Sequence, residues 1–174
     1  MTDLTIRDEA PDDIEMIATV TEAAFRDSGL PGDRTEQYVV AALREARALT
    51  ISLVAEEAGR MVGHIAFSPA VISDGATGWY TLGPVSVLPE RQRQGIGSTL
   101  IHQGLGRLKA IGAKGSVLVG HPDYYPRFGF VHRDDLGYEG IPPEVVFALS
   151  FDGRYPTGVI TDQVESPPTS AQHP

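Results

Sequence analysis

The sequence contains no cysteine among its 174 residues. This absence excludes disulfide bonds, thiolate metal ligands and a cysteine nucleophile, and it is typical of a reducing compartment, so we expect a cytoplasmic protein. Long apolar runs are also missing, since no stretch approaches the roughly 18 residues of a membrane-spanning helix. The first residues lack the apolar segment of a signal peptide. We therefore expect neither a membrane contact nor secretion.

Two further patterns are missing, and each excludes a class of active site. The five histidines do not occur at metal-ligand spacings, so we expect no metal cofactor. No Gly-x-Ser-x-Gly motif occurs, which argues against a nucleophile-elbow hydrolase.

Acidic residues dominate the charge, with 23 Asp and Glu against 14 Lys and Arg and a net charge of −9. Nucleic-acid binding needs an extended basic face, so we expect no nucleic-acid partner. One segment differs, because no acidic residue occurs from Arg91 to Pro122. That segment carries five basic residues, namely Arg91, Arg93, Arg107, Lys109 and Lys114. A basic segment in an acidic protein favours the binding of a small polyanion.

Apolar periodicity and turn signals predict an α/β (α+β) protein. Strands are expected at 4–6, 50–56, 61–72, 79–88, 116–119, 130–132 and 145–151. Helices are expected after Pro11, after Asp33 and over 95–111. Ile111 is expected to be the last residue on the apolar side of the third helix. These elements predict a mixed, mostly antiparallel sheet of about seven strands with helices on both faces. We expect one domain over 1–165 and a disordered tail, rich in Pro and Ser, over 166–174.

The dipeptide Gly83-Pro84 interrupts the expected fourth strand. Proline removes a donor from the hydrogen-bond ladder, so the fourth and fifth strands should splay apart at this point. Such a splay would leave unpaired backbone groups along the fourth strand.

A glycine motif follows the same strand and precedes the longest helix. It reads Gln92-x-x-Gly95-x-Gly97. Glycines let backbone N–H groups approach a phosphate, and the N-terminus of a helix adds about half a positive charge. The dinucleotide fingerprint would require a third glycine where Leu100 stands, and the phosphate-binding loop of nucleotide hydrolases would require a lysine before its Ser or Thr.

This motif, placed after Val87-Leu88-Pro89, resembles the acetyl-CoA signature of the GNAT superfamily of N-acetyltransferases. A second segment about thirty residues on, Tyr124-Tyr125-Pro126-Arg127-Phe128-Gly129-Phe130, is similar to the Tyr-x-x-x-Gly-Phe segment of that family. The order of elements from Thr5 to about Phe151 fits its fold. Residues 82–89 and 120–125 look most like the YhbS-like branch.

The resemblance implies acetyl-CoA as cosubstrate. Its pyrophosphate would lie on the N–H groups of Gln94 to Ser98, assisted by Arg93 or Arg91. Its pantetheine arm would pair with the backbone of Val85 and Val87. The cofactor-binding residues implied are Val85, Ser86, Val87, Gln92, Arg93, Gln94, Gly95, Ile96, Gly97 and Ser98.

The resemblance also implies direct attack of a substrate amine on the thioester in a ternary complex. Tyr125, four residues before Gly129, holds the position of the general acid, and we favour it over Tyr124. The candidates for the base stay open and are Glu36, Glu56, His64 and His121. His64 shares one face of its expected strand with Val62 and Ala66, which favours a packed core histidine.

The expected acceptor is a primary amine of a small molecule or peptide. The segment around Gly29–Arg34, the second helix and the C-terminal strands would select it. Many such folds dimerise, and the strands near the C-terminus are the expected edge for a homodimer. The alternative function is a catalytically weak acyl-CoA-binding or regulatory module of the same fold.

Overall fold

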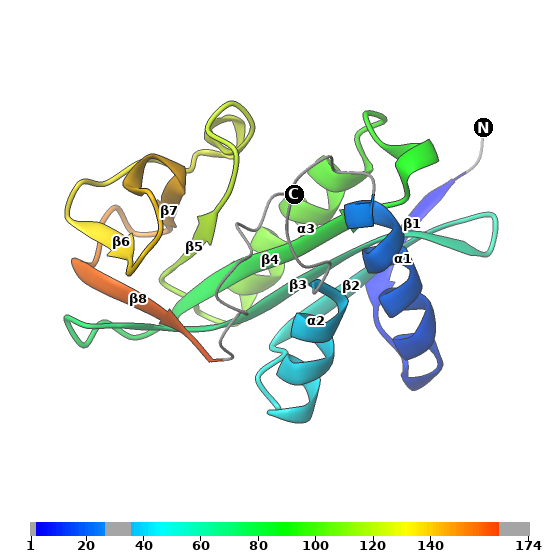
Figure 1. The fold of residues 1–174 in the computed structure, drawn as a ribbon, viewed down its shortest axis with the longest axis horizontal. Helices are drawn as coiled ribbons and strands as arrows, with labels where there is room; N and C mark the ends of the chain where they lie inside the picture. The colour runs from blue at the N-terminus through cyan, green and yellow to red at the C-terminus, as the bar shows by residue number, and fades with distance from the viewer. Residues whose placement is uncertain (1–2, 27–35, 164–174) are drawn as a thin grey trace.

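The computed structural model describes residues 3–26 and 36–163. Within them, one central sheet holds six strands in the spatial order β1 (Leu4–Asp8), β2 (Ile51–Glu57), β3 (Arg60–Ile72), β4 (Trp79–Val87), β5 (Gly115–Val119) and β7 (Val146–Ser150). The pair β4–β5 is parallel, and the other neighbours in this order are antiparallel. Two short strands, β6 (Leu136–Tyr138) and β8 (Gly158–Asp162), extend the far end of β3 (Figure 1).

Helices cover both faces of the sheet, as the sequence predicted. The residues of α1 (Ile14–Arg26) and α2 (Glu36–Glu45) pack against each other, and both helices contact β4. The third helix, α3 (Ile96–Ala110), contacts β2, β3, β4 and β5. Strand pleating separates the two layers, since Gly63 and Phe67 on β3 face α3 while His64 faces the opposite side.

The close fit of α3 on the sheet depends on a small residue. A Cβ at Gly104 would lie 2.2 Å from Cε2 of Phe67, so the ring occupies the space that any other side chain would need. The apolar side of α3 is buried as predicted at Ile96, Leu100, Ile101, Leu105 and Leu108. Ile111 is a correction, because the helix ends before it and its side chain is 55% exposed.

The hairpin between β2 and β3 forms at Ala58 and Gly59. Both residues have positive φ angles, 52° and 77°, which is the geometry of a tight type I′ turn. The long β3 then pairs with β2 and β4 over its first part and with β8 over its last residues.

The predicted splay of β4 from β5 is present. Their parallel ladder has three pairs and ends at Thr81 and Val117, although β4 continues to Val87. The Gly83–Pro84 peptide bond is cis and coincides with an irregularity in the β3–β4 register. From Leu82 on, β4 therefore has a hydrogen-bonded neighbour on the β3 side alone, within the described chain.

Two details of the structure differ from the sequence prediction. The segment 130–132 is not a strand and forms one isolated bridge, between Val131 and Ala148. The strands β6 and β8 were not predicted, and they bring the described sheet system to eight strands, in line with the expected mixed, mostly antiparallel sheet of about seven. The segment around Gly29–Arg34, the residues directly after Asp33 where the second helix was expected to begin, and the tail 166–174 lie outside the described residues.

Candidate functional site

The free edge of β4 is the first component of the site. The N–H of Leu88 donates to the carbonyl of Val62 at 2.9 Å, and Ser86 lies opposite His64 in the same register. Hydrogen-bonded pairs alternate with non-bonded pairs in an antiparallel ladder, so the peptide groups of Val85 and Val87 point away from β3. The Val87 carbonyl confirms this direction, because it accepts the side-chain amide of Gln92 at 3.0 Å.

The turn between β4 and α3 is the second component. A short 3-10 helix, η2 (Pro89–Arg91), leads into Arg93 and Gly95, which have positive φ angles of 63° and 86°. Gly95 is the N-cap of α3, and its carbonyl accepts both the N–H and the hydroxyl of Thr99. Within the described residues, the N–H groups of 93–98 have no hydrogen-bond acceptor in the protein. This turn therefore presents donors at the positive end of a helix.

The two arginines of this turn differ in their partners. Arg91 donates two hydrogen bonds to the carboxylate of Glu57, which raises the pKa of the guanidinium, and one to Gln94. Arg93 is exposed and forms no ion pair with the described part of the chain. Of the two, Arg93 is thus the cation that an anion at the turn would meet without competition.

The tyrosine segment lies on the α3 side of the sheet. Tyr125 begins η3 (Tyr125–Phe128), is 2% exposed and packs edge-on against Phe130 at 6.0 Å between ring centroids. A Cβ at Gly97 would lie 3.4 Å from the Tyr124 hydroxyl, which places that hydroxyl at the first turn of α3. Burial raises the pKa of Tyr125, so its phenol holds its proton more firmly than a free tyrosine.

The four candidate bases lie in different surroundings. Glu56 on β2 is bound to Arg7 at 2.8 Å and is two strands away from β4. His121 is exposed, and its Nδ1 accepts the N–H of Asp123 at 3.1 Å. Glu36 begins α2 and is 7% exposed, and its Oε2 has no hydrogen-bond partner among the described residues.

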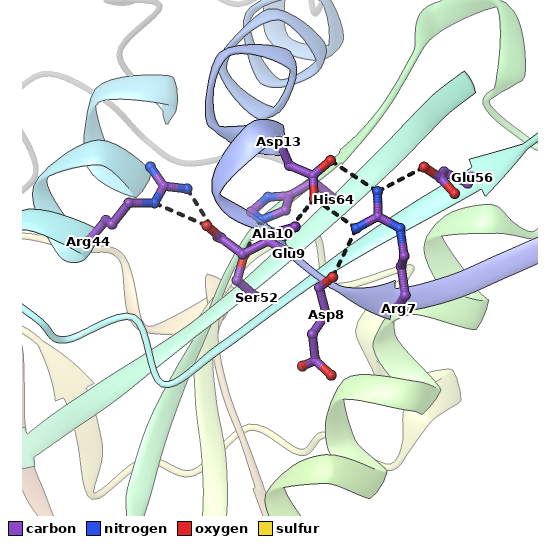
Figure 2. Close-up of polar contacts among 9 residues, drawn as sticks. All are labelled: Arg7, Asp8, Glu9, Ala10, Asp13, Arg44, Ser52, Glu56 and His64. Atoms are coloured by element: carbon purple, nitrogen blue, oxygen red, sulfur yellow. Dashed lines mark hydrogen bonds and ion pairs between the residues drawn. The ribbon is translucent and has the colours of Figure 1, made fainter. Parts of the chain in front are cut away.

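His64 is buried as predicted, but it belongs to a polar chain that sequence reasoning missed. Its Nε2 lies 2.7 Å from the hydroxyl oxygen of Ser52, and that hydroxyl makes a short hydrogen bond to the carboxylate of Glu9. Arg44 donates to both oxygens of Glu9, at 3.0 and 3.1 Å. Figure 2 shows this chain beside the separate network of Arg7, Asp13 and Glu56. No local motif signals it, because its members come from distant segments.

A second polar cluster lies where the β4–β5 ladder ends. The hydroxyl of Thr81 donates to Oδ1 of Asp162 at 2.6 Å, and the hydroxyl of Tyr138 donates to the same oxygen at 3.2 Å. Burial raises the pKa of the Asp162 carboxyl. Because β6 and β8 were not predicted as strands, the contact between these three side chains was not predicted either.

Two features are missing from the described residues. None of the helices in 3–26 and 36–163 is long and apolar enough to cross a membrane. In the same ranges, no group of three or more His, Cys, Asp or Glu side chains is arranged to hold a metal ion.

This fold, with a strand parted from its parallel neighbour and a glycine turn at the head of a helix, defines a class of protein. Residues 5–133 match the family model described as an acetyltransferase (GNAT) domain. The chain therefore belongs to the GNAT acetyltransferase family, as the two motifs predicted.

Similar proteins come from the bacteria Escherichia coli and Brucella melitensis. The chain is 32% identical over 135 residues to the uncharacterized N-acetyltransferase YhbS of Escherichia coli K12, over 75% of this chain and 77% of that protein. A GNAT acetyltransferase from Brucella melitensis, solved in complex with acetyl-CoA, is 47% identical with a TM-score of 0.80, over 91% of this chain and 94% of that chain. YhbS from Escherichia coli, solved in complex with CoA, is 28% identical with a TM-score of 0.83, over 92% and 89%.

Proposed function

We propose that this protein transfers the acetyl group of acetyl-CoA to a primary amine of a small molecule or peptide. The observation that carries the proposal is the early end of the β4–β5 ladder at Thr81, which leaves the outward peptide groups of Val85 and Val87 without a strand partner among the described residues. Pantetheine contains two amides, which complement such a strand edge. The relatives solved with acetyl-CoA and CoA support the same cosubstrate.

The free edge leads to the donor-rich turn before α3. The N–H groups of Gln94 to Ser98 and the exposed guanidinium of Arg93 would together hold the pyrophosphate. Gln92 has a supporting role, since its amide is bound to the Val87 carbonyl and closes the strand end. Ile96 is buried beneath the turn and fixes the helix to the sheet.

Acetyl transfer joins the amine nitrogen to the thioester carbon, breaks the carbon–sulfur bond and frees one proton from the nitrogen, which a base or a water molecule must accept. The departing thiolate needs a proton, and Tyr125 is the proposed donor. The tyrosine segment and α3 share one side of β4, whereas His64 and Ser86 lie on the other. This division gives the leaving sulfur and the attacking amine separate sides of the strand.

The burial of Tyr125 favours a second candidate function, a catalytically weak acyl-CoA-binding module. An acid with a raised pKa is a poorer donor to a thiolate unless it is held close to the sulfur. The two functions predict the same affinity for acetyl-CoA and differ in turnover.

The test has two parts. Release of CoA from acetyl-CoA is measured with a panel of primary amines and lysine-containing peptides. Turnover supports the transferase, and binding of acetyl-CoA without turnover on any amine supports the module.

Binding is then compared by calorimetry for wild type, Gly97→Glu and Gly106→Glu. Both glycines lie in α3, but Gly97 is in its first turn and Gly106 is exposed with open space around it. We expect Gly97→Glu to abolish binding and Gly106→Glu to preserve it. Equal affinity in all three proteins would refute the assigned phosphate site.

A further inference from the structure

Asp162 is held by two hydroxyl groups at the point where β4 and β5 part. The hydroxyls of Thr81 and Tyr138 both donate to its Oδ1, at 2.6 and 3.2 Å. Burial raises the pKa of the Tyr138 phenol, so this group stays protonated and remains a donor. Because both hydrogen bonds use one oxygen, they fix the carboxylate and leave Oδ2 to another partner.

The structure supplies no such partner in the part of the chain that it describes. Oδ2 of Asp162 accepts no hydrogen bond there, and no lysine, arginine or histidine of 3–26 and 36–163 forms an ion pair with Asp162. The residue is partly exposed, and Oδ2 is not one of the buried atoms that lack a partner, so solvent reaches it. A carboxylate in partly buried surroundings is normally paired with a cation or with donors at both oxygens. Oδ2 is therefore open to a hydrogen of a bound molecule.

Thr81 places this carboxylate on the face of the sheet opposite α3. Paired residues of neighbouring antiparallel strands project on the same face, and Thr81 is paired with Ser68. Ser68 shares a face of β3 with His64, and that face is the one turned away from α3. The carboxylate of Asp162, bound to Thr81, therefore lies on the side of β4 opposite Tyr125.

The proposed path of pantetheine ends near the same point. Its two amides would meet the peptide groups of Val87 and Val85, and the pyrophosphate would lie beyond Val87, so the thioester end runs toward Thr81. Strand residues rise about 3.3 Å each, and the thioester follows the second amide by about 5 Å, which brings it to the level of Gly83. Gly83 and Thr81 are then about 7 Å apart along β4. One nitrogen fits this interval, about 3 Å from the thioester carbon and about 3 Å from a carboxylate oxygen.

We propose that Asp162 is the general base of the acetyl transfer and that its Oδ2 takes the proton freed from the acceptor nitrogen. The inference rests on the proposed function and adds a catalytic residue to it. The nitrogen of a neutral amine bonds to the thioester carbon, and one of its protons passes to Oδ2. The carbon–sulfur bond breaks, its electron pair stays on sulfur, and sulfur takes the proton of Tyr125. After the products leave, Asp162 loses its proton to water and the Tyr125 phenolate takes one up, so both groups return to their starting states.

The surroundings of Asp162 suit a base. Burial raises the pKa of its carboxyl, and the hydroxyls of Thr81 and Tyr138 oppose this shift without cancelling it. The residue opposite Asp162 on β3 is Ala70, which carries no charge. A carboxylate with a raised pKa takes up a proton more readily than an ordinary aspartate, which is the property that a base near neutral pH requires.

The first experiment needs no acceptor. The protein is labelled with 13C-aspartate, and the carboxyl signal of Asp162 is identified by its loss in Asp162→Asn. Acetyl-CoA at saturation should shift that signal, and CoA should shift it less because CoA lacks the acetyl group. The signal of Asp134, whose side chain is fully exposed, is the internal control and should not move. An Asp162 signal that acetyl-CoA leaves unmoved, or that CoA shifts equally, would overturn the proposal whether or not any amine is acetylated.

The second experiment uses the amine with the highest turnover in the panel. Asp162→Asn keeps an oxygen for the two hydroxyls but no longer accepts a proton, so kcat should fall by about 100-fold or more while the KM for acetyl-CoA stays unchanged. The matched control is Asp134→Asn, which removes an exposed carboxylate just before β6 and should keep wild-type kcat. Wild-type kcat in Asp162→Asn would overturn the assignment of the base, whereas failure of wild type on every amine would count against the proposed transfer itself.

Discussion

Gly120, at the end of β5, lies directly against the ring of Tyr125. A Cβ at position 120 would be 2.2 Å from Cε2 and 2.7 Å from Cδ2 of that ring. The absence of a side chain at Gly120 therefore fixes where the proposed acid lies, on the α3 side of the sheet and beside Leu118.

Gly120→Ala should consequently displace the Tyr125 ring or the end of β5. Both are buried, so we expect a loss of about 1–3 kcal/mol in the free energy of unfolding, which is typical of overpacking a well-filled interior. Urea denaturation measures the loss. Unchanged stability together with unchanged turnover would mean that the ring moves freely, contrary to the tight contact described.

Two glycines in α3 offer a comparison within one helix. An added methyl group at Gly104 meets Phe67 at 2.2 Å, whereas Gly106 is exposed with nothing within 4 Å. Gly106→Ala should stabilise the protein by up to about 1 kcal/mol, because alanine is the better helix former. Gly104→Ala should destabilise it by about 1–3 kcal/mol despite the same gain in propensity. Thermal and urea unfolding of the two variants give this difference in sign, and shifts of equal sign would contradict the packing of α3.

Most of the fold follows from local patterns in the sequence. The hairpin at Ala58-Gly59, the break at Gly83-Pro84 and the periodicity of α3 each involve neighbours along the chain. The strand β8 shows why other parts of the fold could not be predicted from local patterns. Its Val159-Ile160-Thr161 core has β-branched residues, with Ile160 buried and Val159 exposed, but its pairing with the end of β3 joins residues about ninety positions apart.

The candidate site divides in the same way. The glycine turn and the tyrosine segment could be recognised in the sequence, because each is one continuous stretch of the chain. The chain of Glu9, Ser52 and His64 could not, because 43 residues separate the first two and 12 separate the last two. The predicted burial of His64 is confirmed, but an apolar strand face carries no information on which hydroxyl the His64 ring meets.

Replacing the two tyrosines by phenylalanine separates their roles. Tyr125→Phe should lower kcat by at least about 100-fold with an unchanged KM for acetyl-CoA, because it removes the proposed proton donor but keeps the ring. Tyr124→Phe should affect acetyl-CoA binding more than kcat, because its hydroxyl lies at the first turn of α3. The reverse pattern would assign the acid to Tyr124.

The pH profile adds a check on this assignment. Since burial raises the pKa of Tyr125, its phenol stays protonated at least up to its ordinary pKa of about 10. An alkaline loss of activity below that pH must then come from another group. The pH at which such a loss occurs should be the same in the residual activity of Tyr125→Phe. If the alkaline loss disappeared in that variant, the phenol of Tyr125 could not be buried and protonated as described.

Burial of His64 makes the fold sensitive to mild acid. Its pKa is lowered to about 4, from about 6.5 in an exposed histidine, so the unfolded chain takes up the proton first. The stabilising contribution is complete above pH 6.5 and is lost as pH falls toward 4. Urea denaturation at successive pH values should show this decline in wild type. The decline should be smaller in His64→Gln, and equal slopes in the two proteins would contradict a neutral buried ring.

A second loss of folding stability, at lower pH, should come mainly from Asp13. Its hydrogen bonds with Arg7, at 2.7 and 3.0 Å, lower the pKa of its carboxyl to about 2, with further help from the Ala10 N–H. The folded state then keeps Asp13 ionised at a pH where the unfolded chain has begun to protonate it near pH 4. Stability is therefore lost as pH falls from about 4 to 2, and Asp13→Asn should reduce that slope. Asp12→Asn is the matched control, because Asp12 is exposed and has no hydrogen bond to the described residues. Equal slopes for the two variants would mean that the Arg7–Asp13 pair does not resist acid and that the loss of stability has another origin.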